Sequence, residues 1–287
     1  MKGIVLAGGT GSRLWPTTKV VSKQLLPIYD KPLIYYPIGT LMQLGIRDIL
    51  IITTEQDSPQ FQNLLGNGND FGVNISFETQ KKPEGLAQAF WIAEEFIGND
   101  NVTLILGDNI FHGLEINFSL ISEFEKGALI FGYQVADPER YGVLEFDRSG
   151  NILSIEEKPK IPKSNYVVPG LYIFDNFVVS KSKMISKSSR GEYEIASVLQ
   201  QYLEQGKLKA KLLSRGFAWM DCGTIQSMGE ASAYVRALEE RQGAKIACIE
   251  EIAFNHGWIN KDSLSKRADE YKNNEYGKYL TNLITIK

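Results

Sequence analysis

A glycine-rich turn directly after a short apolar run constrains this chain more than any other feature. Residues 3–7, Gly-Ile-Val-Leu-Ala, have the composition of a buried β-strand, and residues 8–13, Gly-Gly-Thr-Gly-Ser-Arg, follow at once. A buried strand that ends in closely spaced glycines presents several backbone N–H groups together, and such a concavity binds phosphate. Arg13 and Lys23 add positive charge beside it. The stretch therefore predicts a polyphosphate-binding loop.

Two common phosphate-binding patterns do not fit this turn. The dinucleotide fingerprint G-x-G-x-x-G needs glycine or alanine at the last position of the frame that starts at Gly9, and that position is Leu14. The P-loop needs a lysine directly after its last glycine, and none follows here before Lys19. Leu14 thus argues against a nicotinamide-dependent oxidoreductase, an alternative that the absorbance of a bound cofactor would test.

Composition and charge narrow the class of protein further. With 287 residues, 43% hydrophobic and 23% charged, the chain has the make-up of an ordinary globular protein with a sizeable core. A formal net charge of −3 gives no reason to expect a nucleic-acid partner, because duplex binders need a basic patch. Cys222 and Cys248 lack metal-ligand spacing. With no signal segment and no run of about 18 apolar residues, we expect a cytoplasmic protein with no membrane partner.

The order of strand-like and helix-like segments predicts an α/β fold. Short β-branched apolar runs, typical of buried strands, occur at residues 3–7, 48–53, 74–77, 102–106 and 128–135. Amphipathic stretches long enough for crossover helices lie between the early ones, at residues 33–44, 59–65 and 84–96. Strands that alternate with helices imply βαβ units and a doubly wound, mostly parallel sheet.

The pattern changes after about residue 140. Three strand-like segments, at residues 141–146, 152–155 and 167–174, follow one another with only turns between them and predict antiparallel additions. Residues 147–151 have the composition of a hairpin turn. Helical patterns return at 194–204 and 226–241, with a strand near 208–213. Residues 244–287 suggest a small helical C-terminal appendix.

An ordered set of motifs continues from the glycine turn to the end of the predicted α/β region. The chain reads LAGGTGSRLWPTT from Leu6, SKQLLPIYDKPLIYYP from Ser22, LGDNIFHG from Leu106, DPERYGVLEFD from Asp137, EEKP from Glu156, GLYIFD from Gly170, RGEYEI from Arg190 and AWMDCGT from Ala218. In order and spacing these motifs resemble the sugar-phosphate nucleotidylyltransferases, and among them the glucose-1-phosphate thymidylyltransferases. The resemblance covers essentially the whole chain.

The resemblance implies an organisation and an activity. It implies a Rossmann-like nucleotidyltransferase domain at residues 1–243, with a nucleotide half at about 1–135 and a sugar-phosphate half at about 136–243, and a C-terminal interface segment at 244–287. The implied reaction converts dTTP and α-D-glucose 1-phosphate into dTDP-α-D-glucose and pyrophosphate, with Mg²⁺ as cofactor. It also implies a homotetramer, feedback by a dTDP-sugar and a role in dTDP-deoxysugar synthesis such as that of rhamnose. Tyr271, Tyr276 and Tyr279 are compatible with an interface if they are exposed.

Nucleotidyl transfer joins two anions, which sets what the site must supply. The protein has to provide positive charge, N–H donors and a divalent metal, and to hold the attacking oxygen and the leaving pyrophosphate in line; no protein nucleophile is needed. The predicted catalytic residues are therefore Arg13, Lys23, Asp108 and Asp221, with Lys23 as the main cation beside the leaving pyrophosphate. His112 and His256 are interpreted as structural, because an ionised phosphate needs no general base.

Asp108 and Asp221 are the predicted metal ligands. Asp108 follows the strand at 102–106, at the edge where ligands bind in open α/β sheets, and Asp221 lies in an abrupt turn after apolar residues. Mg²⁺ suits two carboxylates together with phosphate oxygens and waters. Taken singly, each aspartate could instead cap a turn or a helix, and this is the favoured interpretation of Asp221 by itself. The resemblance to the nucleotidylyltransferases implies metal ligation by both.

The resemblance also implies two sets of binding residues. The nucleotide is expected to contact Leu6, Gly8, Gly9, Thr10, Gly11, Ser12, Arg13, Gln24, Gln80, Gly85 and Asp108. Gln80 offers an amide donor and acceptor that match the imide edge of thymine or uracil, although a glutamine read alone is usually a surface residue. The sugar phosphate is expected to contact Asn109, Tyr141, Gly142, Glu157, Lys158, Val168, Gly170, Arg190 and Trp219. In this set the resemblance implies that backbone groups of Gly142 and Val168 and the Glu157 carboxylate take sugar hydroxyls and that Lys158 takes the phosphate, with Glu192 close by. Packing in the core is the alternative for Tyr141 and Trp219.

Three positions depart from the family pattern. Pro169 replaces a threonine and removes one backbone N–H beside the expected sugar site, Ser197 replaces an aspartate, and Cys222 replaces a threonine. A sensor that binds nucleotide sugars without turnover is an alternative, although the presence of all four expected catalytic residues argues against it. The preference between dTTP and UTP stays open, since one methyl group on the base is worth only about 1–3 kcal/mol.

Overall fold

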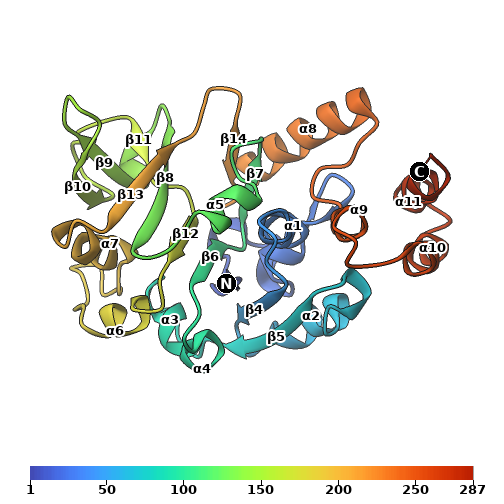
Figure 1. Ribbon diagram of the computed structural model, residues 1–287, viewed down its shortest axis with the longest axis horizontal. Helices are drawn as coiled ribbons and strands as arrows, with labels where there is room; N and C mark the ends of the chain where they lie inside the picture. Colours follow the sequence, from blue (N-terminus) through green and yellow to red (C-terminus); the bar gives the residue numbers. More distant parts are fainter. Residues whose placement is uncertain (287) are drawn as a thin grey trace.

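A ten-stranded mixed sheet forms the centre of the computed structural model, which describes residues 1–286 (Figure 1). The strand order is β10-β9-β11-β8-β12-β6-β1-β4-β5, and β13 pairs with β8. The strands of this sheet are β1 (Lys2–Leu6), β4 (Asp48–Thr53), β5 (Asn74–Thr79), β6 (Val102–Leu106), β8 (Ala128–Gln134), β9 (Gly142–Phe146), β10 (Ile152–Glu157), β11 (Tyr166–Val167), β12 (Leu171–Phe174) and β13 (Leu208–Leu212). Two small antiparallel sheets pair β2 (Pro27–Ile28) with β3 (Lys31–Pro32) and β7 (Asn109–His112) with β14 (Ala218–Asp221).

The parallel part of the sheet creates the crevice in which a ligand can bind. Strands β6, β1, β4 and β5 are all parallel, and Ile4 of β1 aligns with Leu50 of β4 on one side and Leu104 of β6 on the other. The chain leaves β1 toward β4 and β5 and then returns to β6 on the opposite side, so the strand order reverses between β1 and β6. Open α/β sheets bind ligands at the carboxyl ends of strands at such a switch point. The glycine turn after β1 and Asp108 after β6 both emerge there.

Helices cover both faces of the sheet, because the central strands are apolar on both sides. Ile4 packs into the core on one face and Val5 into the core on the other, as the alternation of side chains along a strand requires. One core includes residues of α1 (Tyr35–Gln43), α2 (Ser58–Leu65) and α9 (Ile249–Asn255), and the other includes residues of α3 (Gln88–Ile92), α4 (Glu94–Ile97), α6 (Val178–Lys183) and α7 (Ile195–Glu204). The predicted doubly wound α/β fold is confirmed.

The helix predicted at residues 84–96 is wrong in extent. Residues 84–87 are not helical, and the helical part divides into α3 and α4 at Ala93, which has φ −89° and ψ 6°. Gly85 has φ 119°, and the flanking backbone pairs with Tyr193, whose N–H donates to the Glu84 carbonyl at 2.7 Å and whose carbonyl accepts from Ala87 N–H at 3.2 Å. A long-range backbone pairing therefore replaces the first helical turn.

The antiparallel additions after residue 140 are present. Strands β9 and β10 form a hairpin, and Asp147 in its turn accepts hydrogen bonds from the N–H groups of Ser149 and Asn151, both at 2.8 Å. The single strand predicted at 167–174 is instead two strands, β11 and β12, interrupted at residues 168–170. Pro169 lies in the interruption and has no N–H to donate to a ladder.

The C-terminal helices lie at one end of the molecule and the antiparallel strands at the other (Figure 1). Helix α8 (Ile225–Gln242) precedes α9, and α10 (Lys261–Glu270) and α11 (Glu275–Ile286) complete the predicted helical appendix; a short helix, α5 (Phe118–Ser122), was not expected. The division of the chain into residues 1–243 and 244–287 stays a prediction. None of the helices in the described range 1–286 is long and apolar enough to span a bilayer.

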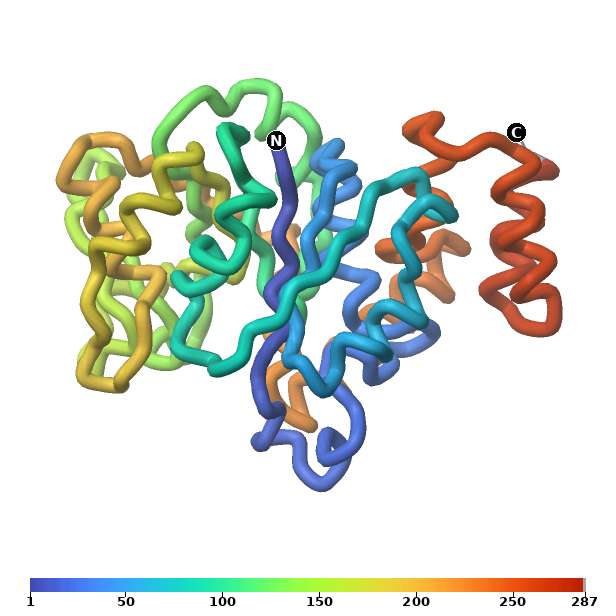
Figure 2. Tube along the Cα trace, turned by 90° about the horizontal axis from the view of Figure 1, so that it is seen from below, coloured from blue at the N-terminus to red at the C-terminus, as the bar shows by residue number. Residues whose placement is uncertain are grey.

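Figure 2 shows the blue N-terminal segment after β1 projecting from the middle of the molecule. This segment carries the glycine turn, two short 3-10 helices at Ser12–Leu14 and Thr17–Lys19, and a third at Lys23–Leu25. Lys23, at the start of the third of these helices, pairs with Asp108, which follows β6.

Candidate functional site

A cavity of about 670 Å³ opens at the carboxyl edge of the sheet, beside the switch point. All nine residues predicted for the sugar phosphate line it: Asn109, Tyr141, Gly142, Glu157, Lys158, Val168, Gly170, Arg190 and Trp219. Three of the four predicted catalytic residues, Arg13, Asp108 and Asp221, line it as well. Glu192, expected near the sugar phosphate, lines the cavity too, and so do six residues for which the sequence predicted no role: Leu86, Leu106, Arg140, Tyr172, Glu194 and Ile195.

Two aromatic side chains form a wall of this cavity. The rings of Tyr141 and Trp219 meet edge to face with centroids 5.1 Å apart. Trp219 is only 8% exposed, and its Nε1 donates a hydrogen bond to Asn109 Oδ1 at 2.7 Å. Trp219 therefore both packs in the core and lines the cavity: its ring is held rigidly by its neighbours, and one side of the ring faces the cavity.

Asn109 connects the aromatic wall to the carboxylates. Its Oδ1 accepts hydrogen bonds from Trp219 and from the Gly170 N–H, the latter at 3.2 Å, and its Nδ2 donates to Asp108 Oδ1 at 3.0 Å. Both the Oδ1 and the Nδ2 of this side chain are thus engaged in hydrogen bonds within the protein. Asn109 thus fixes the orientation of the aspartate beside it.

Asp108 and Asp221 lie side by side although they are far apart in the sequence. Strand β14 pairs with β7 so that Asp221 aligns with Asn109, and the Cys222 N–H donates to the Asp108 carbonyl at 2.9 Å. The Lys23 ammonium forms an ion pair with Asp108. The sequence did not predict β7 or β14 as strands, and their pairing brings Asp108 and Asp221 together, while Lys23 reaches Asp108 from the loop after β1.

The two carboxylates are in different electrostatic states. Burial alone would favour the neutral acid at Asp108, but the Lys23 charge and hydrogen bonds from Lys23 and Asn109 outweigh it and lower the pKa of Asp108. Burial and the neighbouring Asp108 charge instead raise the pKa of Asp221. Like charges held this close are relieved by a cation, and two carboxylate donors fit Mg²⁺ that takes its other ligands from phosphate and water. No cluster of three or more His, Cys, Asp or Glu side chains suited to a metal occurs in the described part of the chain.

Arg13 approaches the same carboxylates from the glycine turn. A Cβ atom at Gly223 would lie 3.1 Å from Arg13 Nη2 and 3.1 Å from Asp221 Oδ1, so the absence of a side chain at Gly223 lets the two groups approach. Gly9 and Gly11 have φ 111° and 58°, conformations that L side chains rarely adopt. The turn chemistry of the sequence therefore directs Arg13 toward Asp221.

The opposite end of the cavity is rich in acid. Arg190 lies 3.5 Å from Glu157, 3.4 Å from Glu192 and 3.6 Å from Glu194. Burial raises the pKa of Glu157, with Lys158 acting against it. Carboxylates aligned in this way suit sugar hydroxyls, which can donate hydrogen bonds to them. The Val168 N–H and the Gly142 carbonyl, both near this end, already bond to each other at 2.9 Å.

The predicted nucleotide residues are only partly brought together. A second cavity, of about 440 Å³, is lined by Gly9, Thr10, Gly11 and Lys23 together with residues near Thr54. Six of the predicted residues lie outside the lining of both cavities in the described structure, and these are Leu6, Gly8, Ser12, Gln24, Gln80 and Gly85.

Gln80 and Gln24 are both buried rather than on the surface. Gln80 packs against Gly8, where a Cβ would lie 2.8 Å from its Oε1, and its Nε2 donates to Gln88 Oε1 at 2.6 Å. Gln24 accepts a hydrogen bond from the Ser22 hydroxyl at 2.6 Å. The expectation that an isolated glutamine at position 80 lies on the surface is wrong, and its amide stands directly beneath the glycine turn.

The histidines and cysteines lie apart from this chemistry. His112 is half-buried with its ring 6.2 Å from that of Tyr234, and burial lowers its pKa. His256 stacks on Trp258 with ring centroids 4.7 Å apart. Cys222 and Cys248 are buried free thiols whose pKa burial raises.

Comparison with known proteins decides the family. A family model described as nucleotidyl transferase matches residues 2–237. This chain belongs to that family. It is 55% identical over 285 residues to the glucose-1-phosphate thymidylyltransferase of Mycolicibacterium smegmatis and 54% identical over 286 residues to that of Neisseria gonorrhoeae, with 99% of each chain covered in both cases.

Solved structures agree with this assignment. A Bacillus anthracis protein described as a glucose-1-phosphate thymidylyltransferase, solved with sucrose, superimposes with a TM-score of 0.77 at 44% identity over 82% of this chain and 95% of that one. A UDP-glucose pyrophosphorylase solved with UDP-glucose superimposes with a TM-score of 0.72 at 24% identity over 84% of this chain and 99% of that one, and shares the fold. The resemblance seen in the sequence is confirmed, and this nucleotidyltransferase is an enzyme of nucleotidyl transfer.

Proposed function

We propose that this nucleotidyltransferase is a Mg²⁺-dependent glucose-1-phosphate thymidylyltransferase, which converts dTTP and α-D-glucose 1-phosphate into dTDP-α-D-glucose and pyrophosphate. The observation that carries the proposal is the 670 Å³ cavity, which unites the nine expected sugar-phosphate residues with Arg13, Asp108 and Asp221. The relatives that match 99% of the chain at 54–55% identity bear the same activity in their names.

The chain's own residues divide the work between the two ends of the cavity. A phosphate oxygen of the sugar substrate attacks the α-phosphorus of dTTP; the new P–O bond forms as the bond to the bridging oxygen breaks, and that oxygen leaves with its electron pair on pyrophosphate. Arg13 and the N–H groups of the glycine turn hold the triphosphate, and Lys23 stabilises charge on the leaving group. The sugar lies against Trp219, with its hydroxyls toward Glu157.

Asp108 and Asp221 are the residues that would hold the metal. Magnesium, when bound, neutralises charge on the phosphate oxygens and polarises the phosphorus under attack. Asp108 is kept ionised by Lys23, and Asn109 fixes its orientation through a 3.0 Å hydrogen bond. Both features keep Asp108 an oriented, ionised carboxylate, as a ligand of a cation has to be.

A panel of substrates tests the proposal. Purified protein with Mg²⁺ is incubated with dTTP or UTP, each combined with glucose 1-phosphate, galactose 1-phosphate or mannose 1-phosphate, and products are separated by anion-exchange chromatography. We expect the highest kcat/KM for dTTP with glucose 1-phosphate. Absence of dTDP-glucose and of pyrophosphate release would overturn the proposal, and higher kcat/KM with UTP would correct the nucleotide.

Assembly, regulation and pathway remain predictions. A homotetramer, feedback by a dTDP-sugar, a supply of dTDP-glucose for deoxysugars such as rhamnose, and a cytoplasmic location are expected by resemblance to the family. The three tyrosines considered for an interface are half-buried, and two of them are tied inward: Tyr276 donates to Glu250 at 2.6 Å and Tyr279 to Glu251 at 2.7 Å. The expectation that they are exposed is wrong, so they lend no support to an interface.

A further inference from the structure

The side-chain amide of Gln80 is held by hydrogen bonds that fix its orientation. Gln80 directly follows β5 at the carboxyl edge of the sheet and is only 6% exposed. Its Oε1 faces the glycine turn, where a Cβ at Gly8 would lie 2.8 Å away, and its Nε2 donates to Gln88 Oε1 at 2.6 Å. The donor end and the acceptor end of an amide have almost the same shape, so its partners decide which way it is turned.

Glu84 fixes the amide of Gln88 by two hydrogen bonds of opposite sense. Its carboxylate accepts from Gln88 Nε2 at 3.2 Å, and its backbone N–H donates to Gln88 Oε1 at 3.3 Å. Lys187 bonds to this carboxylate at 2.7 Å and lowers the pKa of Glu84, which is therefore ionised at neutral pH and can only accept. A reversed Gln88 amide would place donor against donor and acceptor against acceptor. Gln88 Oε1 therefore has to face Gln80, and Gln80 has to present its Nε2.

The loop that carries Glu84 does not depend on these side chains for its anchoring. Its backbone is held by Tyr193, whose N–H donates to the Glu84 carbonyl at 2.7 Å and whose carbonyl accepts from the Ala87 N–H at 3.2 Å. What the side chains of Glu84 and Gln88 add is the orientation of the Gln80 amide.

We propose that Glu84 and Gln88 are positioning residues that hold the Gln80 amide in one orientation, and that this orientation makes the nucleotide site select an imide base, thymine or uracil, over cytosine. The inference rests on the proposed function, because it assumes that the base of the nucleotide meets Gln80 while its phosphates lie on the glycine turn.

The selection follows from the order of donors and acceptors. The fixed Gln80 amide offers its Oε1 and the second N–H of its Nε2, which match the ring N–H and a carbonyl of an imide. Cytosine carries an amino donor and a ring-nitrogen acceptor in the reverse order, so it needs the amide turned over. Turning Gln80 over would break its hydrogen bond to Gln88 and place two carbonyl oxygens against each other.

The selectivity of a single variant tests the inference. We measure the ratio of kcat/KM for dTTP to that for dCTP, each with glucose 1-phosphate, and the corresponding ratio of Kd values by calorimetry. Gln88→Met removes the acceptor that faces Gln80, and we expect both ratios to fall about tenfold or more, chiefly through a gain with dCTP. Gln200→Met is the matched control, because Gln200 bonds to Glu204 at 3.1 Å on α7 and lines neither cavity; it should leave the ratios unchanged.

A double variant separates orientation from simple structural support. Glu84→Gln combined with Gln88→Glu exchanges the two groups and keeps their combined charge. A carboxylate at position 88 can only accept, so it still requires Gln80 to present its Nε2. The double variant should therefore keep the dTTP to dCTP ratio within about threefold of wild type even where its overall activity falls.

The outcomes distinguish this inference from the proposed function. A ratio in Gln88→Met within about twofold of wild type overturns the inference, and so does an equal loss with both nucleotides, which a purely structural role predicts. If Gln88→Met fails to fold by circular dichroism, the double variant decides: a preserved ratio supports the fixed orientation and a lowered ratio refutes it. Calorimetry needs no turnover, so a wild-type protein that binds dTTP in preference to dCTP but releases no pyrophosphate refutes the proposed function alone. Equal binding of dTTP and dCTP by wild type refutes the inference alone.

Discussion

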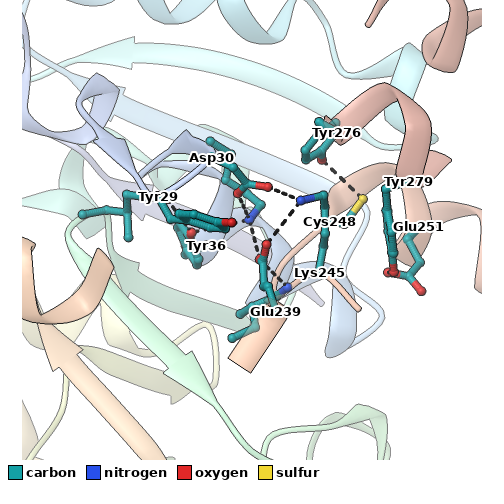
Figure 3. A network of polar contacts seen from close by, with 12 residues as sticks. Tyr29, Asp30, Tyr36, Glu239, Lys245, Cys248, Glu251, Tyr276 and Tyr279 are labelled. Carbon is teal, nitrogen blue, oxygen red and sulfur yellow. Dashed lines mark hydrogen bonds and ion pairs between the residues drawn. The ribbon is translucent and has the colours of Figure 1, made fainter. Parts of the chain in front are cut away.

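Glu239 lies at the centre of a buried ion cluster that ties the C-terminal part of the chain to the N-terminal part (Figure 3). Its Oε1 accepts from Lys31 Nζ at 2.8 Å and from the Ile246 N–H at 2.8 Å, and its Oε2 lies 3.3 Å from Lys245 Nζ. Both lysines also pair with Asp30. Side-chain exposure is 4% for Glu239 and 2% for Lys31, so water cannot replace a lost partner.

The cost of removing Glu239 follows from these contacts. Glu239→Ala leaves two buried ammonium groups with one carboxylate, and breaking a buried ion pair costs about 3–5 kcal/mol. It also removes the acceptor of the Ile246 N–H, which adds about 1 kcal/mol or more. We expect a loss of about 4–6 kcal/mol of unfolding free energy, which corresponds to a melting temperature lower by about 10 °C for a chain of this size. Glu239→Gln keeps an acceptor for Ile246 and should lose less.

Urea denaturation followed by circular dichroism, together with calorimetry, measures this loss. Glu240→Gln is the matched control, because Glu240 is the exposed neighbour on the same helix and should change stability by less than about 0.5 kcal/mol. A stability of Glu239→Ala within about 1 kcal/mol of wild type would refute the reasoning, since the cluster would then contribute little.

Four further predictions concern the site and its surroundings. Lys23→Met should lower kcat about 100-fold or more in protein that circular dichroism shows to be folded, and it should also lower the urea midpoint, because it removes the cation paired with the buried Asp108; kcat within about tenfold of wild type would contradict its role at the leaving group. Asp221→Asn should abolish the Mg²⁺-dependent part of dTTP binding in calorimetry, and wild-type Mg²⁺ dependence would rule out ligation by Asp221. Gly85→Ala should destabilise the protein by about 2 kcal/mol or more in urea denaturation, because its Cβ would lie 2.4 Å from the Tyr193 carbonyl oxygen at φ 119°; an unchanged midpoint would refute this clash. Burial opposes ionisation of Asp30, but Lys31 and Lys245 outweigh it and lower the pKa of Asp30, so the carboxylate stabilises the fold above about pH 4 and this stabilisation is lost as pH falls through the lowered pKa. Asp30→Asn should therefore be less stable than wild type at neutral pH, and the difference in unfolding free energy should shrink in urea titrations below about pH 4; a difference that stays constant with pH would contradict this.

Local signals in the sequence predicted much of the fold. Strands β1, β4 and β6 are buried on both faces of the sheet, and their continuous runs of apolar residues are enough to predict this burial. The hairpin turn at residues 147–151 was equally predictable, because Asp147 supplies local acceptors for the backbone that follows it. These features depend on residues close together in the chain, so they can be predicted without knowing which strands pair.

Predictions failed where distant backbone decided the local structure. The first turn of the helix expected at residues 84–96 is absent, because the backbone of residues 84–87 forms hydrogen bonds with the backbone of Tyr193. The strand expected at 167–174 is interrupted at Pro169, where the chain passes from β11 to β12. Neither partner segment can be identified from the periodicity of the segment itself.

Local patterns in the chain are enough to predict the glycine turn and the alternation of strands and helices, and the motifs identify the residues that a nucleotidyltransferase needs. How these residues meet depends on tertiary contacts: the pairing of β7 with β14 sets Asp221 beside Asp108, and the loop after β1 brings Lys23 to Asp108 and Arg13 to Asp221. Composition and periodicity report which residues are buried, whereas a site is made by strand register and loop closure between segments that are distant in the chain.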